Sequence, residues 1–303
     1  MQNKDFGNKF AEKLTEMKIA IFGSRHQRQH LAHIAQLAAA LHSRNVEVWL
    51  DRRFYDYIHP LIPEFGVGGI IEGNDFDADY AISIGGDGTF LRTAARVGAK
   101  QIPIAGINTG HLGYLADVPI CQPESFVDDL LTHNVTVDVR QLIDVTAEGF
   151  DYHLAALNEL AIQKNASASM LHIHVAVDGS ELTTYLGDGL IVSTPTGSTA
   201  YNLSVGGPIM HPACRSIVIS PIAAHSLTMR PLVLPDDVVL EITTTSKRSD
   251  SFRASVDGNS DELPMGTTLR LSKADYGVHI VQHRSHDFAE TLRKKLMWGA
   301  DAR

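Results

Sequence analysis

The chain has 303 residues, of which 44% are hydrophobic and 20% are charged, and its formal net charge is −9. This composition is that of a globular protein with one large or two modest domains. The acidic balance argues against a nucleic-acid-binding protein, because neutralising phosphates requires a surplus of lysine and arginine on some face. The sequence has no run of about 18 apolar residues that would indicate a membrane helix, and its N-terminal segment lacks the apolar region of a signal peptide. We therefore expect a cytoplasmic protein with neither nucleic acid nor membrane as a partner.

The first half of the chain alternates between strand-like and helix-like segments. Short apolar runs predict strands, and apolar residues at helical spacing predict helices between them. The predicted strands are Ile19–Phe22, Val46–Leu50, Tyr80–Ile84 and Ile102–Ile107, and the predicted helices span about 31–41, 90–97 and 126–131. Strands separated by helices are typical of a parallel sheet with helices on its faces. This part is predicted to be an α/β domain.

From about residue 136 the pattern changes to alternating, β-branched runs with few helical segments, which predicts an all-β domain. Asp178-Gly179 lies between two such runs and indicates a hairpin turn. The last apolar segments, VHIVQHR and FAETLRKKLMW, predict one more strand and a helix that return to the first domain. We therefore predict an α/β domain formed by residues 1–141 and 276–303, and an all-β domain formed by residues 142–275.

The first candidate site is the segment Gly85-Gly86-Asp87-Gly88-Thr89, between a predicted strand and a predicted helix. Glycines let the backbone turn sharply and approach a ligand, and a helix N-terminus offers free N–H groups to phosphate. Asp87 is the only carboxylate in the turn, and its ionised form is favoured there, so it could accept a proton or contact a metal. The alternative is a tight turn in which Asp87 caps the helix. The segment lacks the P-loop pattern.

The second candidate is the hydroxyl-rich segment Thr194–Tyr201, which follows the apolar run Leu190–Ser193. Gly197 permits a close backbone approach, short hydroxyls can bind ligand hydroxyls or phosphate, and Tyr201 could lie against a base. The alternative is a serine- and threonine-rich turn.

The third candidate is the pair Asn158-Glu159, which interrupts the apolar run Leu154–Ile162. An asparagine can recognise a base edge, and a glutamate can accept hydrogen bonds from ribose hydroxyls. The alternative is a strand edge that faces solvent.

The cysteines and histidines indicate no metal site. Cys121 and Cys214 lie far apart without metal-ligand spacing, so we expect free, buried thiols. His172 and His174 share a strand face, but no third ligand is evident, so surface or packing roles are expected. The ligands of any metal are left unassigned.

Together these motifs resemble those of the bacterial NAD kinases, and the resemblance runs from about residue 17 to residue 300. The segments that carry it are GGDGT (85–89), NTGHLGYL (108–115), LNE (157–159), 187–201 and SLTMRPLV (226–233). The run TPTGSTAY (194–201) is highly specific, whereas GGDGT is shared with diacylglycerol kinases, sphingosine kinases and 6-phosphofructokinases.

The resemblance implies a Rossmann-like N-terminal domain, a β-sandwich-like C-terminal domain, and a homotetramer or homodimer with NAD bound between the domains. It also implies an enzyme that transfers the γ-phosphoryl of ATP to the 2′-hydroxyl of the adenosine ribose of NAD, giving NADP and ADP. The expected cofactor is a divalent cation, Mg²⁺ above all. Whether another phosphoryl donor can replace ATP is left open.

Carried over residue by residue, the resemblance makes Asp87 the proton acceptor, Asn158 and Glu159 the pair that holds the adenosine, and Asp188 the carboxylate near the nicotinamide. The expected nucleotide-binding residues are Gly85, Gly86, Asp87, Gly88, Thr89, Arg92, Asn158, Glu159, Ser169, Asp188, Thr199, Ala200, Tyr201, Asn202, Leu203, Ser204 and Asn259.

This chain departs from the family pattern at three places. Leu186-Gly187-Asp188-Gly189 replaces Arg-Ser-Asp-Gly, so a cation near the cofactor is missing and NAD-versus-NADH selectivity stays open. Asn259 stands where Gln is common, and Ser169 stands where some relatives have a basic or imidazole side chain.

Two other functions remain as alternatives. A lipid or sphingoid kinase could share the GGDGT turn, but the hydroxyl-rich segment 194–201 argues against an apolar mouth. A non-catalytic NAD(P)-sensing module could share the same residues, and the presence of Asp87 argues against it.

Overall fold

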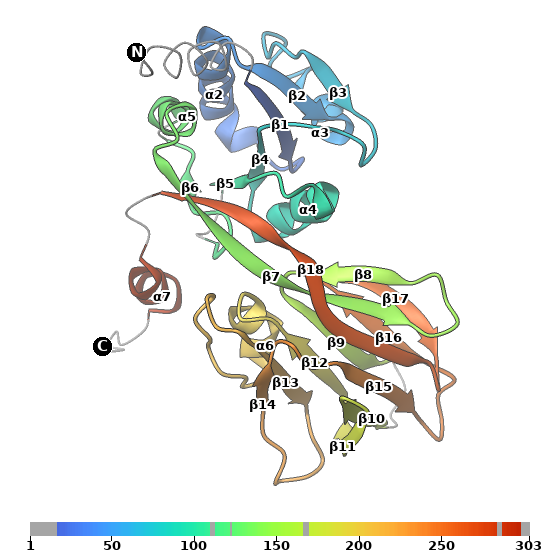
Figure 1. The fold of residues 1–303 in the computed structure, drawn as a ribbon. Helices are drawn as coiled ribbons and strands as arrows, with labels where there is room; N and C mark the ends of the chain where they lie inside the picture. Colours follow the sequence, from blue (N-terminus) through green and yellow to red (C-terminus); the bar gives the residue numbers. More distant parts are fainter. Residues whose placement is uncertain (1–16, 110–112, 122, 166–169, 284–286, 298–303) are drawn as a thin grey trace, which may run out of the picture. The chain divides into compact units, whose positions relative to one another are not determined.

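A computed structural model describes residues 17–109, 113–121, 123–165, 170–283 and 287–297 (Figure 1). The chain forms two compact units. Unit 1 comprises Met1–Val139 and Val278–Arg303, and unit 2 comprises Arg140–Gly277. Two long strands, β7 (Val135–Ala147) and β18 (Thr268–His283), contribute residues to both units. Within the described ranges, no helix is long and apolar enough to cross a membrane.

Unit 1 is built on a parallel sheet in the order β18-β5-β4-β1-β2-β3, with the short strand β6 beside β5. The register pairs Ile21 with Ile82 and Ile104 with Ile280, so the returning segment completes this sheet. The strands are β1 (Lys18–Gly23), β2 (Glu47–Asp51), β3 (Gly69–Ile71), β4 (Tyr80–Gly85), β5 (Ile104–Asn108) and β6 (Val118–Pro119).

The faces of this sheet are covered by α2 (Leu31–Ser43), α3 (Arg52–Ile58), α4 (Asp87–Val97) and α5 (Pro123–Leu131). The helix α7 (Phe288–Leu296) follows β18. Buried residues of α2, α3 and α5, such as Leu37, Phe54 and Val127, form one core with Ile21 of β1. On the opposite face, Arg96 of α4 lies over the ring of Phe22, which follows Ile21 and therefore points the other way.

Unit 2 consists of two antiparallel sheets. One has the order β11-β10-β15-β18, with β7 beside β18 and β8 beside β7, and the other has the order β14-β13-β12-β9-β16-β17. Their bounds are β8 (His153–Ala156), β9 (Glu159–Lys164), β10 (Leu171–Val177), β11 (Ser180–Gly187), β12 (Gly189–Ser193), β13 (Ser216–Ile222), β14 (Leu232–Pro235), β15 (Leu240–Thr245), β16 (Ser251–Val256) and β17 (Asn259–Pro264).

Alternating apolar residues of both sheets form the core of unit 2. Ile173 and Ile242 come from the first sheet, and Ile162, Val192 and Phe252 come from the second. Inner faces that alternate with polar outer positions make a β-sandwich. The predicted fold class, an α/β domain with a β-sandwich-like domain and a returning strand and helix, is confirmed.

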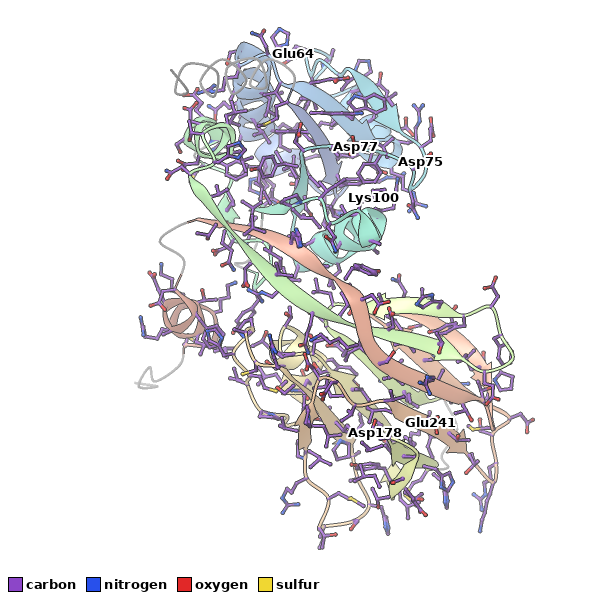
Figure 2. The ribbon with its side chains drawn as sticks, viewed as in Figure 1. Glu64, Asp75, Asp77, Lys100, Asp178 and Glu241 are labelled. Carbon is purple, nitrogen blue, oxygen red and sulfur yellow. The ribbon has the colours of Figure 1, made fainter. Side chains whose placement is uncertain are left out.

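The predicted hairpin turn at Asp178-Gly179 is also present. Both residues have positive φ, 50° and 77°, as a two-residue turn of this kind requires. The Asp178 carboxylate accepts a hydrogen bond from Val239 N–H at 2.8 Å, just before β15, the strand that carries Glu241 (Figure 2).

Several predicted elements differ from those observed. The strand predicted at VHIVQHR is the last part of the much longer strand β18, which ends at His283, and the apolar run 154–162 is divided into β8 and β9. The expected free thiols of Cys121 and Cys214 are unpaired, but both residues are exposed rather than buried. Cys121 lies in the turn between β6 and α5, and Cys214 lies in the segment before β13.

Candidate active site

The glycine-rich turn of unit 1 joins β4 to α4. Every residue of β4 is buried, Gly86 is the N-cap of α4, and α4 begins at Asp87. Thr89 N–H donates to the Gly86 carbonyl at 2.9 Å, which closes the first turn of the helix. One turn later, Arg92 folds back, and its Nη2 donates to Thr89 Oγ1 at 3.1 Å. The structure therefore brings the expected residues 85–89 together in one turn with Arg92.

The Asp87 carboxylate is held by the segment that follows β5. Oδ2 accepts a hydrogen bond from Tyr114 N–H at 2.7 Å, and Oδ1 accepts from Leu115 N–H and Ala116 N–H at 3.0 and 3.1 Å. The alternative in which Asp87 caps its own helix is therefore wrong, since Gly86 is the cap. A carboxylate has about four acceptor positions, so this arrangement fills both on Oδ1 and leaves one on Oδ2.

Gly113 makes room for this carboxylate. A Cβ at Gly113 would lie 2.6 Å from Asp87 Cγ and closer still to Oδ1. No larger residue fits without moving the carboxylate. Next to it, burial raises the pKa of the Tyr114 phenol, and the charge of Asp87 adds to the effect. The expected motif residues 110–112 lie outside the described part of the chain.

In unit 2, Asn158 and Glu159 lie at the break between β8 and β9. Asp257, about a hundred residues later, holds this break: its carboxylate accepts from the N–H groups of Leu157, Asn158 and Glu159 at 2.7, 2.8 and 3.1 Å. Asn158 and Glu159 are each only 8% exposed. The alternative of a solvent-facing strand edge is therefore wrong, because Asp257 and the segment after β12 cover these residues.

Two carboxyl groups are thus close together in unit 2. The pKa of Glu159 is raised to about 8, first by burial and then by the neighbouring charge of Asp257, against a backbone hydrogen bond from Tyr201 that lowers it. Burial also raises the pKa of Asp257, against the three N–H groups that favour its ionised form. Glu159 Oε2 is buried and has no hydrogen-bond partner among the residues described. With a pKa of about 8, the Glu159 carboxyl is largely protonated at neutral pH.

The hydroxyl-rich segment 194–201 packs against this break. Thr194 Oγ1 donates to the Leu157 carbonyl at 2.6 Å, and Thr194 N–H donates to the Asn158 carbonyl at 2.9 Å. Ser198 Oγ donates to the Pro195 carbonyl at 2.7 Å. These hydroxyls build the segment itself. Gly197 lies so close that a Cβ there would be 2.6 Å from Asn158 Cα, so its close approach is to the chain's own backbone.

The expected ligand-lining residues after this segment lie in and around the short helix α6 (Tyr201–Ser204). Thr199, Ala200, Tyr201 and Leu203 are half-buried, and Ser204 is exposed. Asn202 differs, because it is fully buried: its amide donates to the Ser198 and Pro208 carbonyls, and its Oδ1 accepts from Ser220 Oγ at 2.6 Å. The observed contacts of Asn202 hold the protein together.

The remaining expected residues are more dispersed. Asp188 stands between β11 and β12, and its carboxylate forms an ion pair with Lys164 Nζ at 2.6 Å. A cation is thus present beside Asp188, although Leu186 replaces the arginine of the family pattern. Asn259 is exposed at the start of β17, and Ser169 lies outside the described residues.

Three residues of the site were not foreseen from the sequence: Gly113, Lys164 and Asp257. The signal at Asp257 was an Asp-Gly pair after an apolar strand, which is typical of a hairpin turn. That turn exists, with positive φ at both residues, but its carboxylate serves a segment distant in sequence. Local pattern does not show such a contact.

A glycine turn that leads from a buried parallel strand into a helix N-terminus, with a carboxylate fixed beside it, is suited to the class of proteins that bind and transfer phosphate groups. Comparison with known families narrows the class. The model of the ATP-NAD kinase N-terminal domain matches residues 11–135, and that of the ATP-NAD kinase C-terminal domain matches residues 157–283. The chain belongs to the NAD kinase family.

Individual NAD kinases are similar in sequence over nearly all of this chain. An NAD kinase of Bacteroides fragilis is 44% identical over 292 residues, which cover 95% of this chain and 100% of the relative. An NAD kinase of Porphyromonas gingivalis is 43% identical over 292 residues, covering 94% and 99%.

Two solved structures share the fold. Yeast NADH kinase in complex with NADH has a TM-score of 0.85 at 21% identity, covering 95% of this chain and 90% of that one. An NAD kinase from Archaeoglobus fulgidus in complex with ATP has a TM-score of 0.74 at 23% identity, covering 92% and 99%.

Proposed function

We propose that this chain transfers the γ-phosphoryl of ATP to the 2′-hydroxyl of the adenosine ribose of NAD, giving NADP and ADP. Membership of the NAD kinase family supports an ATP-dependent phosphorylation of NAD. The observation that carries the proposal is the state of Asp87. Asp87 lies in the glycine turn at the start of α4. Its carboxylate accepts hydrogen bonds from three N–H groups of the segment after β5 and retains one acceptor position.

In this mechanism Asp87 Oδ2 accepts the proton of the 2′-hydroxyl as that oxygen attacks the γ-phosphorus, and ADP leaves. The N–H groups at the start of α4 face the phosphates. Proton acceptance by a placed base is worth about 10²–10⁴ in rate. Most of the remaining acceleration must come from alignment of the two substrates.

A divalent cation, Mg²⁺ in the first place, is expected to accompany ATP. Among the residues described, no group of three or more His, Cys, Asp or Glu side chains converges. Mg²⁺ keeps several of its waters and is commonly bound by substrate phosphates with one or two carboxylates. When bound, the ion neutralises charge on the β- and γ-phosphates.

The groups that hold NAD are assigned to unit 2. Asn158 would recognise the adenine edge, and protonated Glu159 can donate to one ribose hydroxyl while its free Oε2 accepts from another. Thr199–Ser204 would line the dinucleotide, with Asp188 toward the nicotinamide. Ser169 and Asn259 are assigned more weakly, since only the family pattern supports them.

A coupled assay for NADP formation from ATP and NAD tests the function, and it separates a kinase from a lipid kinase or a sensing module. Asp87→Asn should lower kcat by about 10² or more, because an amide is a poor proton acceptor. Thermal unfolding is measured on the same variant, because its NH2 group also faces the N–H groups that the carboxylate accepts from. A variant that keeps more than half of the wild-type rate would remove Asp87 from the mechanism.

We also propose a closed homo-oligomer, either a dimer or a tetramer, in the cytoplasm. The segment Pro208–Met229 supports assembly, because its Leu227 is 90% exposed, and exposed apolar groups of this kind are typical of subunit contacts. Val233, in the next strand, is also 48% exposed. The exposed free thiols of Cys121 and Cys214 support a reducing compartment. Light scattering across a dilution series, with activity measured on the same samples, tests the assembly. A fully active monomer of 33.1 kDa would contradict it.

A further inference from the structure

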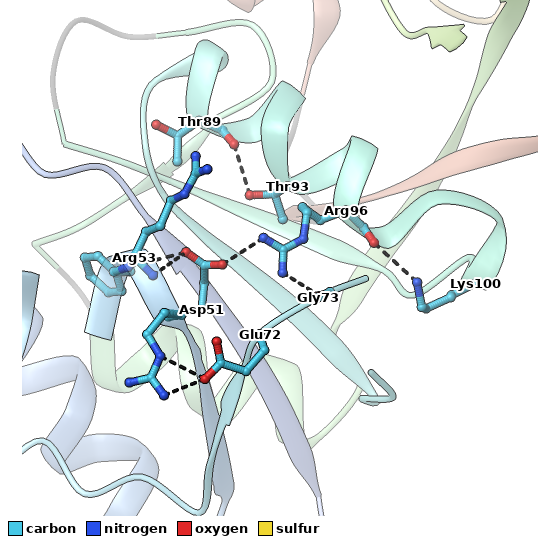
Figure 3. A network of polar contacts seen from close by, with 10 residues as sticks. Asp51, Arg53, Glu72, Gly73, Thr89, Thr93, Arg96 and Lys100 are labelled. Carbon is cyan, nitrogen blue, oxygen red and sulfur yellow. Dashed lines mark hydrogen bonds and ion pairs between the residues drawn. The ribbon is translucent and has the colours of Figure 1, made fainter. Parts of the chain in front are cut away.

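The arginines near the C-terminal ends of the strands in unit 1 fall into two groups. The first group is paired. Asp51 caps α3 and forms an ion pair with Arg96 at 2.9 Å, and Arg52 forms one with Glu72 at 2.5 Å (Figure 3). Arg96 also donates to the Gly73 carbonyl at 2.5 Å. These contacts tie α3, α4 and the segment after β3 together.

The second group consists of arginines that form no ion pair with any carboxylate in the described ranges. We name them the edge arginines: Arg25, Arg28, Arg53 and Arg92. All four are exposed. Four uncompensated guanidinium groups near one sheet edge are unexpected in a chain of net charge −9. Their field attracts an anion.

The edge arginines follow the ends of three neighbouring strands. Arg25 and Arg28 come after β1, Arg53 comes after β2, and Arg92 lies in the helix after β4. β1 pairs with both β2 and β4. The chain leaves β1 toward β2 and leaves β4 toward β5 in the opposite direction. In an open parallel sheet, ligands bind outside the carboxyl ends of the strands at such a switch point.

Hydrogen bonds fix the segment that carries Arg25 and Arg28 beside the glycine turn. Ser24 N–H and Gln27 Nε2 both donate to the carbonyl of Ile84, the residue before Gly85, at 3.1 and 3.4 Å. Gln27 N–H also donates to the hydroxyl of Tyr57 in α3 at 3.1 Å. The segment is thereby held to β4 and to α3 at once.

Arg92 and Arg53 approach the same turn from their own helices. Arg92 Nη1 would be 4.0 Å from a Cβ at Gly88, so this guanidinium lies over the glycine turn. In Figure 3 the Arg53 side chain extends in the direction of Thr89 at the start of α4, away from the Asp51 and Arg96 pair.

One buried polar atom in this segment also lacks a partner. Gln27 is 1% exposed, and within the described residues its Oε1 accepts no hydrogen bond. A buried acceptor left unsatisfied is costly. A nucleotide offers phosphates to the arginines and hydroxyl or amino donors to this oxygen.

We propose that the edge arginines bind the phosphate chain of the donor nucleoside triphosphate and set its KM. This inference rests on the proposed function, because it assigns the donor of that reaction. A triphosphate carries about four negative charges at neutral pH, which matches several unpaired guanidinium groups better than the two charges of the NAD pyrophosphate. Guanidinium groups bind phosphate oxygens in pairs. The residues assigned to NAD belong to unit 2, whereas all the edge arginines belong to unit 1.

The test compares two neighbouring arginines at the start of α3. Arg53→Ala removes an edge arginine, and Arg52→Ala removes one that is paired with Glu72 and serves as the matched control. A double variant, Arg25→Ala with Arg28→Ala, tests the other segment. KM for ATP, KM for NAD, kcat and thermal unfolding are measured for each. Inorganic tripolyphosphate is used as a competitor of ATP, and its binding is also followed by calorimetry.

Arg53→Ala and the double variant should each raise KM for ATP by about tenfold, as expected for loss of a charge-assisted contact. They should weaken tripolyphosphate similarly and leave KM for NAD and the unfolding temperature unchanged. Arg52→Ala should keep wild-type KM for ATP. The inference is overturned if KM for ATP stays unchanged in both edge variants, or if KM for NAD rises as much. If the wild type forms no NADP, the proposed function fails, but calorimetry with tripolyphosphate still decides the arginine site.

Discussion

Replacing Gly113 by alanine should inactivate the enzyme without touching a side chain that takes part in the reaction. The added Cβ would lie 2.6 Å from Asp87 Cγ, whereas carbon atoms in contact are about 3.5–4.0 Å apart. The Asp87 carboxylate must therefore retreat by about 1 Å and lose the geometry of its three N–H bonds. A displacement of about 1 Å at a reacting group can cost about 10²-fold in rate, and overpacking costs about 1–3 kcal/mol of stability.

The assay is steady-state NADP formation, with kcat and both KM values determined for Gly113→Ala. Gly73→Ala is the matched control, because a Cβ at Gly73 meets nothing within 4 Å. Combined with Asp87→Asn, the Gly113 change should add little further loss, since both act on one carboxylate. The reasoning is refuted if Gly113→Ala keeps a kcat within about threefold of wild type while Asp87→Asn is inactive.

Two further predictions concern the carboxyl groups of unit 2. The pKa of Glu159 is about 8 in the folded protein against an ordinary value of 4.5, so the folded state keeps a proton that the unfolded chain releases between these values. Stability from this group is therefore greatest below about pH 4.5, falls as the pH rises through the window, and is level above about pH 8. Glu159→Gln should remove this fall in stability, which amounts to at most ~5 kcal/mol. Unfolding curves of the wild type and the variant across this pH window measure it. A difference in unfolding free energy that does not change with pH would contradict the burial argument. Asp257→Asn places an amide donor against three N–H groups, so it should raise KM for NAD by about tenfold and KM for ATP by less. Equal changes in the two KM values would count against a role of Asp257 in holding Asn158 and Glu159.

Much of the fold follows from local pattern. The strand before Gly85 is a continuous apolar run, as a strand buried on both faces requires, and the residues after it repeat at helical spacing. The turn between them was therefore predictable down to its residues. Helix α3 was not, because RRFYDYI is only seven residues long and begins with two arginines. It forms because the Asp51 carboxylate accepts from the N–H groups of Arg53 and Phe54 at 3.1 and 3.3 Å.

The parts of the site that local pattern missed depend on contacts between distant segments. Asp257 acts on residues about a hundred positions earlier, and Gly113 matters because of the carboxylate of Asp87. Sequence reasoning also treated the hydroxyls of 194–201 as ligand contacts, whereas those of Thr194 and Ser198 hydrogen-bond to carbonyls of the chain itself. Periodicity predicts which face of an element is buried, but not which distant polar group meets it.

The sharing of β7 and β18 has a consequence for synthesis on the ribosome. Unit 2 is one continuous stretch, Arg140–Gly277, and is complete in sequence before the last residues of unit 1 are made. β6 pairs with the end of β5, but Ile104 and Ala105 lack their partner strand until Ile280 and Val281 have emerged, and until then this part of β5 is an open edge. The glycine turn and Asp87 are translated early, yet the sheet that supports them is finished last. Truncation before residue 278 would therefore remove part of the first unit, and release from the ribosome is the step at which the kinase fold can close.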